Sequence, residues 1–150
     1  MKLTNSYIRN INVLEKVNFV HLENLDLHSN EISDINILEK VNFKYLKILN
    51  LSRNKISDIS VLEKVNFPEL QELYLEKNEI TDINVLDKVS FGNLETLDLS
   101  DNKISNIDVL SGIKLEQLKN LYLYDNSLNN NVNSLLVKSL KSKLKNFLYK

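Results

Sequence analysis

Two residues near the start of the chain, His28 and Asp26, have the side chains and spacing of an acid–base or metal-binding pair. A separation of two residues places both side chains on the same face of an extended strand. There an imidazole and a carboxylate can exchange a proton or share a metal ion. The second histidine, His21, precedes this stretch and is expected to lie on the return into the strand. The pair therefore lacks a second histidine on its own face.

Other signatures of catalysis are missing from the 150 residues. The sequence has no cysteine, no glycine-rich phosphate loop and no nucleophile-elbow motif. Asp98, Asp101 and Asp125 offer oxygens to a cation, but no segment has the dense oxygen ligands of a calcium loop. We therefore expect a protein that is not an enzyme and that has no cofactor and no metal site.

The elements that position these residues belong to a repeated unit, here called a coil. Its first half reads LENLDLHSNEI, LKILNLSRNKI, LQELYLEKNEI, LETLDLSDNKI and LKNLYLYDNSL, beginning at Leu22, Leu46, Leu70, Leu94 and Leu118. Each copy starts 24 residues after the last. Such a period is typical of a stacked array whose units bury their apolar faces only against one another.

Each coil begins with a short strand, which is followed by a turn that has the same residue type in every coil. Leu49 and Leu51 alternate with polar residues, which predicts a strand with one buried face. Because the strand recurs once per coil, the strands must be parallel. An asparagine follows at the same place each time: Asn30, Asn54, Asn78, Asn102 and Asn126. Its amide can both donate to and accept from the backbone, so we expect a buried hydrogen-bonded ladder.

The second half of each coil predicts a short helical or 3₁₀ turn. Segments such as ISDISVLEKVNF share regularly spaced apolar residues, among them Leu62, Val65 and Phe67, which are expected to point inward. Ser60 to Glu63 has the pattern of a capping box. Glu63 and Lys64 are expected to face solvent. The residue after each ladder asparagine alternates in charge, which predicts a row of opposite charges: Glu31, Lys55, Glu79, Lys103.

The pattern L-x-x-L-x-L-x-x-N-x-I, followed by S-D-I or T-D-I, resembles the leucine-rich repeat family from about Tyr7 to Leu128. The I-S-D-I segment is similar to the subclass found in bacterial internalins and in the regulatory leucine-rich subunit of protein phosphatase 1. The repeats of that subclass are typically shorter, and each coil here has two extra residues around the V-N-F segment. The resemblance implies an α/β solenoid with parallel strands on a concave face and short turns on a convex face. It also implies protein binding through the concave face.

The two ends depart from the repeat. We expect one domain, 1–150, made of a partial N-terminal coil at 1–21, repeats at 22–133 and an amphipathic C-terminal cap helix at 134–150. The lysines of this helix leave open a basic surface helix that meets a membrane or a partner. No N-terminal cap is evident, so the first coil is expected to offer an edge for self-association.

The exposed strand positions are the expected binding surface. Three of the six tyrosines fall there, and tyrosine is enriched at interface hot spots. The predicted patch consists of Ile48, Tyr74, Tyr122 and Tyr124, ringed by Arg53, Glu72, Glu76, Asp98 and Asp101. The alternative is that these are ordinary solvated strand residues.

The sequence thus predicts a noncatalytic module that binds a protein. A net charge of −1 gives no general attraction to nucleic acid or to an anionic membrane. No signal-peptide or membrane-spanning stretch is evident, so we expect a cytoplasmic protein, or a secreted one if the chain is a fragment. Three alternatives remain open. They are a regulatory subunit of an enzyme such as a phosphatase, an adhesion module lacking its export signal, and a duplicated or designed array with no selected partner.

Overall fold

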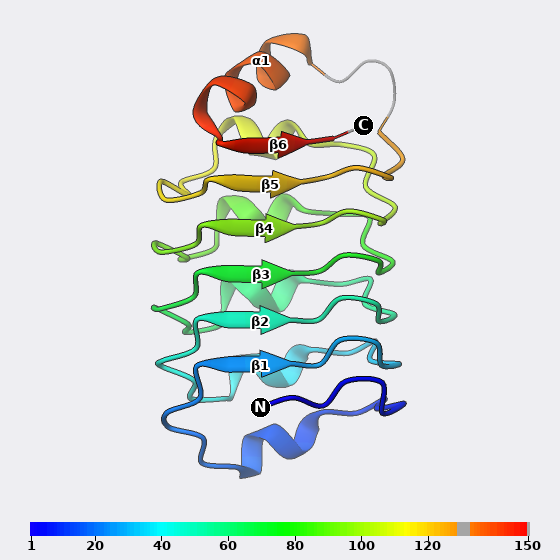
Figure 1. Ribbon diagram of the computed structural model, residues 1–150, viewed down its shortest axis with the longest axis vertical. Coiled ribbons are helices and arrows are strands. Elements are labelled where there is room, and N and C mark those ends of the chain that lie inside the picture. Colours follow the sequence, from blue (N-terminus) through cyan, green and yellow to red (C-terminus); the bar gives the residue numbers. More distant parts are fainter. Residues whose placement is uncertain (129–132, 150) are drawn as a thin grey trace.

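Parallel strands, one from each coil, form a single sheet. The computed structural model describes residues 1–128 and 133–149. Within these residues the strands are β1 (Asn24–Asp26), β2 (Ile48–Asn50), β3 (Glu72–Tyr74), β4 (Thr96–Asp98), β5 (Asn120–Tyr122) and β6 (Asn146–Leu148). They pair in chain order, and from β1 to β5 each residue lies beside the residue 24 positions later. Figure 1 shows this stack of parallel strands, which confirms the predicted solenoid.

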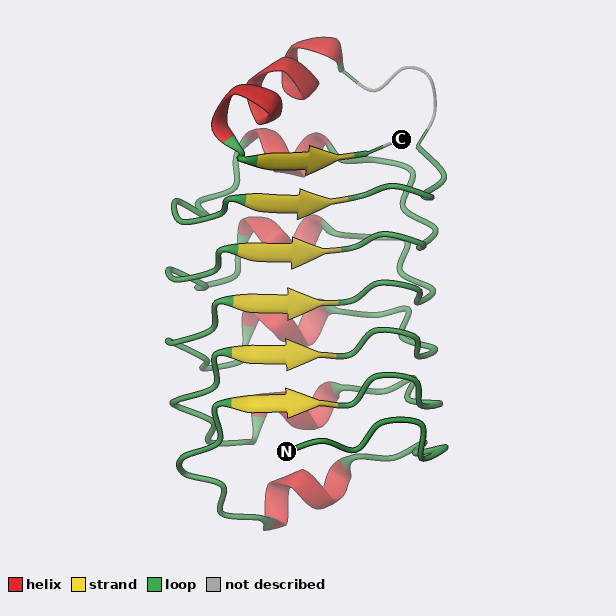
Figure 2. Ribbon diagram, in the orientation of Figure 1, coloured by secondary structure: helices red, strands yellow, loops and turns green. Residues whose placement is uncertain are grey.

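Short 3₁₀ helices return the chain behind the sheet, as Figure 2 shows. They are η1 (Asn12–Lys16), η2 (Asn36–Glu39), η3 (Ser60–Glu63), η4 (Asn84–Asp87) and η5 (Asp108–Ser111). In η3 the side chains of Val61 and Leu62 are buried, whereas Glu63 and the following Lys64 are exposed. The predicted helical turns and their solvent-facing charges are therefore confirmed.

The predicted capping box at Ser60 was wrong. The residue before η3 is Ile59, and no side chain caps the helix. Instead, Asp58 Oδ1 accepts a hydrogen bond from the backbone N–H of Ser60 at 2.8 Å. This N–H is therefore bonded to a side chain two residues upstream, and that bond fixes the turn. The same bond recurs in the other coils, where the accepting side chains are Asn10, Asp34, Asp82 and Asn106.

The asparagine ladder is confirmed. Asn54 is buried, and its Nδ2 donates to the carbonyls of Leu51 at 3.0 Å and of Leu27, in the preceding coil, at 3.1 Å. Its Oδ1 accepts from the N–H of Ile32 at 3.0 Å. One amide therefore satisfies the turn of its own coil and joins two coils. Asn30, Asn78, Asn102 and Asn126 make equivalent bonds.

A continuous apolar core lies between the strands and the 3₁₀ helices. The inward leucines of the strands, such as Leu49 and Leu73, have no exposed surface. Behind them the rings of Phe43 and Phe67 stack with centroids 6.3 Å apart. Burial of each such side chain contributes roughly 1.5–3 kcal/mol relative to exposure. The core therefore depends on contacts between neighbouring coils.

The first coil follows the repeat, with Met1 in place of a strand leucine and Ser6 in place of the ladder asparagine. Lys2 pairs with Asp26 in a parallel bridge, 24 residues apart like the other strand pairs. Ser6 occupies the ladder position, and its backbone N–H donates to Asn30 Oδ1 at 3.1 Å. The ladder therefore continues into this coil through the backbone, because serine cannot supply the amide.

The C-terminal element was predicted too long. The helix α1 spans Ser134–Lys143, and residues 146–148 form β6 instead of continuing the helix. Asn146 N–H donates to the carbonyl of Lys119, and Leu123 N–H donates to the carbonyl of Leu148. The edge of β5 offers unpaired backbone groups, and pairing with them outweighs the helical spacing of the leucines. Leu136, Val137 and Leu140 of α1 are buried as expected of a cap, whereas Leu148 is exposed.

Candidate binding surface

In the pair of His28 and Asp26, the carboxylate bonds to the backbone of the turn. Asp26 Oδ1 accepts a hydrogen bond from the backbone N–H of His28 at 3.1 Å. The other carboxylate oxygen lies 3.9 Å from Lys2 Nζ. Asn50 and Asp98 make the same turn bond in their coils, so the aspartate here has a structural use. Among the described residues, no three histidine or acidic side chains are placed to hold a metal ion.

The strand face is the exposed side of the sheet, opposite the 3₁₀ helices. The strand register aligns its side chains in rows that cross the strands. The central row consists of Asp26, Asn50, Tyr74, Asp98, Tyr122 and Leu148. A second row consists of Asn24, Ile48, Glu72, Thr96, Asn120 and Asn146. Neighbouring members of a row are about 4.8 Å apart at the backbone.

The register brings together four of the predicted residues on β3, β4 and β5. Tyr74 lies directly beside Asp98, which lies directly beside Tyr122. The Tyr74 hydroxyl donates to Glu72 Oε2 at 2.7 Å. Burial and this bond to Glu72 raise the pKa of the Tyr74 phenol above its ordinary value. Tyr74 is therefore a neutral donor that is held in place by its own strand.

Tyr124 lies just after β5, and its side chain is half-buried. Burial raises the pKa of its phenol, and the carboxylates of Asp98, Glu76 and Asp101 act in the same direction. These three carboxylates belong to the residues that were predicted to ring the tyrosines. The β3 to β5 part of the strand face therefore combines aromatic surface with negative potential.

The remaining predicted site residues are Ile48, Arg53 and the turn residue Asp101. Ile48 is half-buried on β2, beside Glu72, and so it does not adjoin Tyr122 or Tyr124. Arg53 Nη2 lies 3.6 Å from Glu76 Oε1 and partly neutralises it. Arg53 and Asp101 occupy turn positions with φ of 56° and 54°, as do Ser29, Lys77 and Asp125. Ile48 therefore adjoins the tyrosines of the predicted patch only through Glu72.

Leu148 was missed as a member of the strand face. It lies beside Tyr122 on β6, and half of its surface is exposed. The repeat pattern stops after Leu128, so the sequence gives no template for a sixth strand. Near it, Phe147 and Tyr149 stack with ring centroids 5.2 Å apart. The strand face thus extends one strand beyond the predicted patch.

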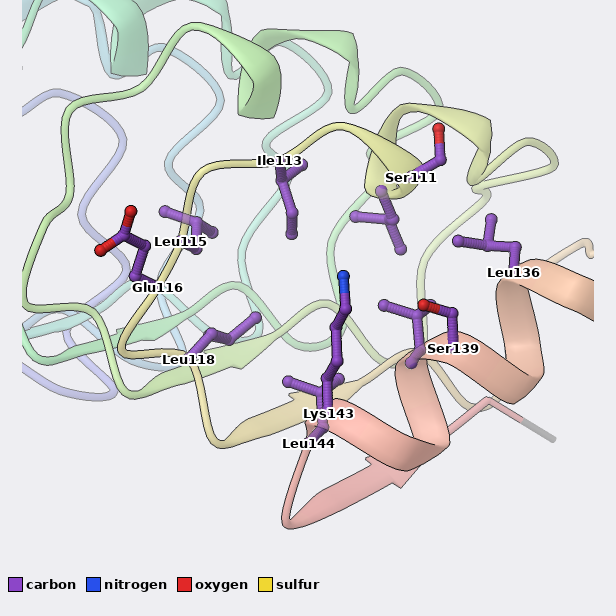
Figure 3. A pocket seen from close by; sticks show the side chains of 11 residues that line it. Ser111, Ile113, Leu115, Glu116, Leu118, Leu136, Ser139, Lys143 and Leu144 are labelled. Atoms are coloured by element: carbon purple, nitrogen blue, oxygen red, sulfur yellow. The ribbon is translucent and has the colours of Figure 1, made fainter.

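A cavity of about 390 Å³ lies between α1 and the fifth coil. Figure 3 shows Leu115, Leu118 and Leu136 around it, with Lys143 reaching in from α1. In the three preceding coils the position of Leu115 is taken by a buried phenylalanine: Phe43, Phe67 and Phe91. The smaller leucine leaves space where the cap meets the coil. This substitution is the sequence signal for the cavity, and we interpret the space as imperfect packing of the cap.

Apolar side chains are also exposed at the N-terminal end of the solenoid. They are Leu3, Tyr7, Val13, Phe19 and Val20. Phe19 is 36% exposed, whereas its counterpart Phe43 in the next coil is 1% exposed. Stacking of one coil on the next accounts for the difference, because no described residue covers Phe19 in the same way. This surface is the predicted N-terminal edge.

Two family profiles match the chain. The profile described as "Leucine Rich repeats (2 copies)" matches residues 20–64 and 44–88. The profile described as "Leucine rich repeat" matches residues 68–128. Together they span more than half of the chain. The chain belongs to the leucine-rich repeat family. Leucine-rich repeat proteins are generally noncatalytic protein–protein interaction modules.

Solved structures place this leucine-rich repeat chain beside internalins. An internalin from Listeria monocytogenes is 28% identical with a TM-score of 0.73, over 93% of this chain and 37% of that one. An internalin C2 from the same organism has the same fold, at 19% identity and a TM-score of 0.61, over 98% of this chain and 77% of that one. This chain thus spans little more than a third of the first internalin. No curated protein matches it significantly. Among its described residues, no helix has the length and apolarity to cross a bilayer.

Proposed function

We propose that this leucine-rich repeat protein is a noncatalytic module that binds a protein partner through its strand face. The observation that carries the proposal is that half-buried Tyr74, Tyr122 and Tyr124 lie on one face, Tyr74 on β3 and the other two on and just after β5. Exposed Leu148 lies beside Tyr122 on β6. Tyrosines bury much area on binding at a low entropy cost and keep a polar tip. The acidic residues around them supply specificity.

Photo-crosslinking tests where the partner binds. A photoreactive phenylalanine analogue at Tyr124 should crosslink a protein in an extract of the source cells. The same analogue at Lys64, on the 3₁₀ side, should not crosslink that protein. Crosslinking of the same protein with equal yield from both positions would contradict binding through the strand face.

A substitution variant tests whether the tyrosines supply affinity. The variant Ile48→Lys, Tyr74→Ala, Tyr122→Ala, Tyr124→Ala should no longer retain the crosslinked partner on an affinity column. Circular dichroism must first show that the variant and the unchanged protein are equally folded. A control variant, Lys64→Ala, Asn66→Ala, Lys88→Ala, changes exposed residues on the opposite side and should retain the partner. Equal retention by both variants would overturn the proposed patch.

The identity of the partner and the location of the protein distinguish a regulatory subunit from an adhesion module. For a regulatory subunit, the crosslinked protein is an enzyme, such as a phosphatase, whose activity changes on binding. For an adhesion module, the natural gene product is found outside the cytoplasm. Cell fractionation with an antibody against the repeats decides between the cytoplasmic location that we propose and export.

Self-association through the N-terminal edge is a second proposal. It is supported by the exposed side chains of Leu3, Val13 and Phe19, which are apolar and lie at one end of the solenoid. Sedimentation equilibrium should show a dimer that the variant Val13→Lys, Phe19→Lys abolishes. A monomer at all concentrations would contradict this proposal and leave binding through the strand face unaffected.

A further inference from the structure

Asp98 occupies a particular place on the strand face. It lies on β4 between two tyrosines in register, Tyr74 on β3 and Tyr122 on β5. The two tyrosine Cα atoms are therefore about 9.6 Å apart, twice the strand spacing. A cation above Asp98 lies midway, about 4.8 Å from each tyrosine strand. A cation in this place has one tyrosine strand on each side, and an aromatic ring attracts a cation whose distance from the ring centroid is within about 6 Å.

The carboxylate of Asp98 is held in place by a turn bond, and the described part of the chain supplies it with no ion pair. Its Oδ1 accepts a hydrogen bond from the Ser100 N–H at 2.9 Å, which fixes the side chain. In the same row, Asp26 has a cationic neighbour, because Lys2 Nζ lies 3.9 Å from its carboxylate. Among the described residues, no lysine, arginine or histidine lies within 4.0 Å of the Asp98 carboxylate.

The surroundings of Asp98 add further negative charge. Glu72 on β3 accepts a hydrogen bond from the Tyr74 hydroxyl, so its carboxylate lies on the same face of the sheet as Tyr74. Asp101 follows β4, and Glu76 follows β3. The turns that follow β2 and β3 also hold two basic residues, Arg53, which is paired with Glu76, and exposed Lys77. Among the described residues, neither Asp98 nor Glu72 has a basic side chain within 4.0 Å, so the slot between the two tyrosines has two carboxylates without an ion pair.

We infer that Tyr74, Asp98 and Tyr122 form a binding slot for a cationic side chain, an arginine or lysine of the protein partner. The carboxylate neutralises the cation, and the two rings contact its apolar and delocalised parts. Arginine fits best because its planar guanidinium both stacks on rings and pairs with carboxylates. This inference rests on the proposed function, of which it names the recognised chemistry.

The chain itself supplies the matched variant. Asn50 takes the position of Asp98 two coils earlier, and its Oδ1 accepts the same turn bond from Ser52 N–H at 3.0 Å. Asp98→Asn therefore removes the charge and keeps the turn. Asp34→Asn removes one charge on the 3₁₀ side, where Asn106 makes the equivalent bond in the fifth coil. The second variant controls for net charge.

Free arginine and citrulline derivatives test the slot without a partner. N-acetyl-arginine amide should shift the NMR resonances of Tyr74, Asp98 and Tyr122 with millimolar affinity. N-acetyl-citrulline amide, which has the same shape without the charge, should not. Asp98→Asn should weaken arginine binding about fivefold or more, whereas Asp34→Asn should leave it unchanged. Equal shifts by both derivatives, or equal affinities for Asp98→Asn and the unchanged protein, would overturn the inference.

Retention of the crosslinked partner separates this inference from the proposed function. If the tyrosine variant loses the partner and Asp98→Asn retains it with unchanged affinity, the cationic slot is wrong and strand-face binding holds. If both lose it, both proposals are supported. If both retain it unchanged, the strand face is not the binding surface, and the arginine titration then shows whether the slot exists apart from that function.

Discussion

Asn78 shows how a single residue joins the coils. Its Nδ2 donates to the carbonyls of Leu51 and Leu75, both at 3.0 Å, and its Oδ1 accepts from Ile56 N–H at 3.0 Å. Asn78→Ala leaves these buried backbone groups without partners. We expect the free energy of unfolding to fall by about 3 kcal/mol. Urea denaturation measures the loss, and Asn66→Ala, at an exposed asparagine of the previous coil, is the control. Equal losses would show that the ladder does not stabilise the fold.

Asp58 gives the turn before η3 a pH dependence. Its carboxylate accepts a hydrogen bond from the Ser60 N–H, and this bond lowers the pKa of Asp58 from the usual 3.8. A carboxyl with a lowered folded pKa stabilises the protein above its usual pKa, and this contribution is lost as the pH falls through the folded pKa. Asp58→Asn keeps the accepting oxygen, as Asn106 does in the fifth coil, and does not titrate. Urea unfolding at pH 6, 4 and 2.5 should therefore show a smaller acid-induced loss in the variant. Identical losses would contradict this assignment.

At the scale of elements, the sequence predicted most of what the 24-residue period repeats, apart from the capping box at Ser60, whose N–H bonds to Asp58 instead. The strands, the 3₁₀ turns and the ladder all follow from residue types that recur in register, as at Leu49 and Asn54. The prediction failed where the period ends. The leucines after residue 134 have helical spacing, yet Leu148 joins a strand because β5 offers a backbone edge to pair with. Such pairing is a tertiary contact, which local spacing does not encode.

The candidate site was predictable only in part, for a related reason. The repeat identifies which strand positions are exposed, so Tyr74, Asp98 and Tyr122 could be placed on one face. The repeat does not identify which exposed residues bond to each other. The hydroxyl of Tyr74 turns to Glu72 on its own strand, and Ile48 is left apart from the C-terminal tyrosines. The bond of Tyr74 depends on its side-chain conformation, which the repeat does not encode, whereas the position of Ile48 on β2 follows from the strand register.

The junction of α1 with the fifth coil supports a prediction at the same scale. Leu115 stands where the earlier coils have phenylalanine, and a cavity of about 390 Å³ borders it. Leu115→Phe should fill part of this space and raise the free energy of unfolding by about 1 kcal/mol, as measured by urea denaturation. Leu97→Phe enlarges a side chain that has no exposed surface and should lower it by about 1–3 kcal/mol. A loss of stability in Leu115→Phe would show that the cap is already tightly packed.

The whole molecule is a stack in which each coil contacts its neighbours, so its stability is spread over repeated interfaces. One exposed row of charges crosses these interfaces. Glu31 Oε2 lies 2.8 Å from Arg9 Nε and 3.4 Å from Lys55 Nζ. Glu79 Oε2 lies 2.8 Å from Lys103 Nζ. These cations lower the pKa of both glutamates, so the row alternates in charge along the stack as the sequence predicted.

Reversing the two lysines tests whether this row stabilises the whole stack. Lys55→Glu, Lys103→Glu places like charges on four successive coils and should lower the Tm measured by circular dichroism, because the alternating attractions become repulsions. Lys44→Glu, Lys114→Glu makes the same change in net charge at exposed positions outside the row. The difference in Tm between the two variants isolates the effect of the row. In 1 M NaCl, where charges are screened within about 3 Å, that difference should shrink. Equal Tm values at low salt would mean that the apolar core and the asparagine ladder alone set the order of the coils.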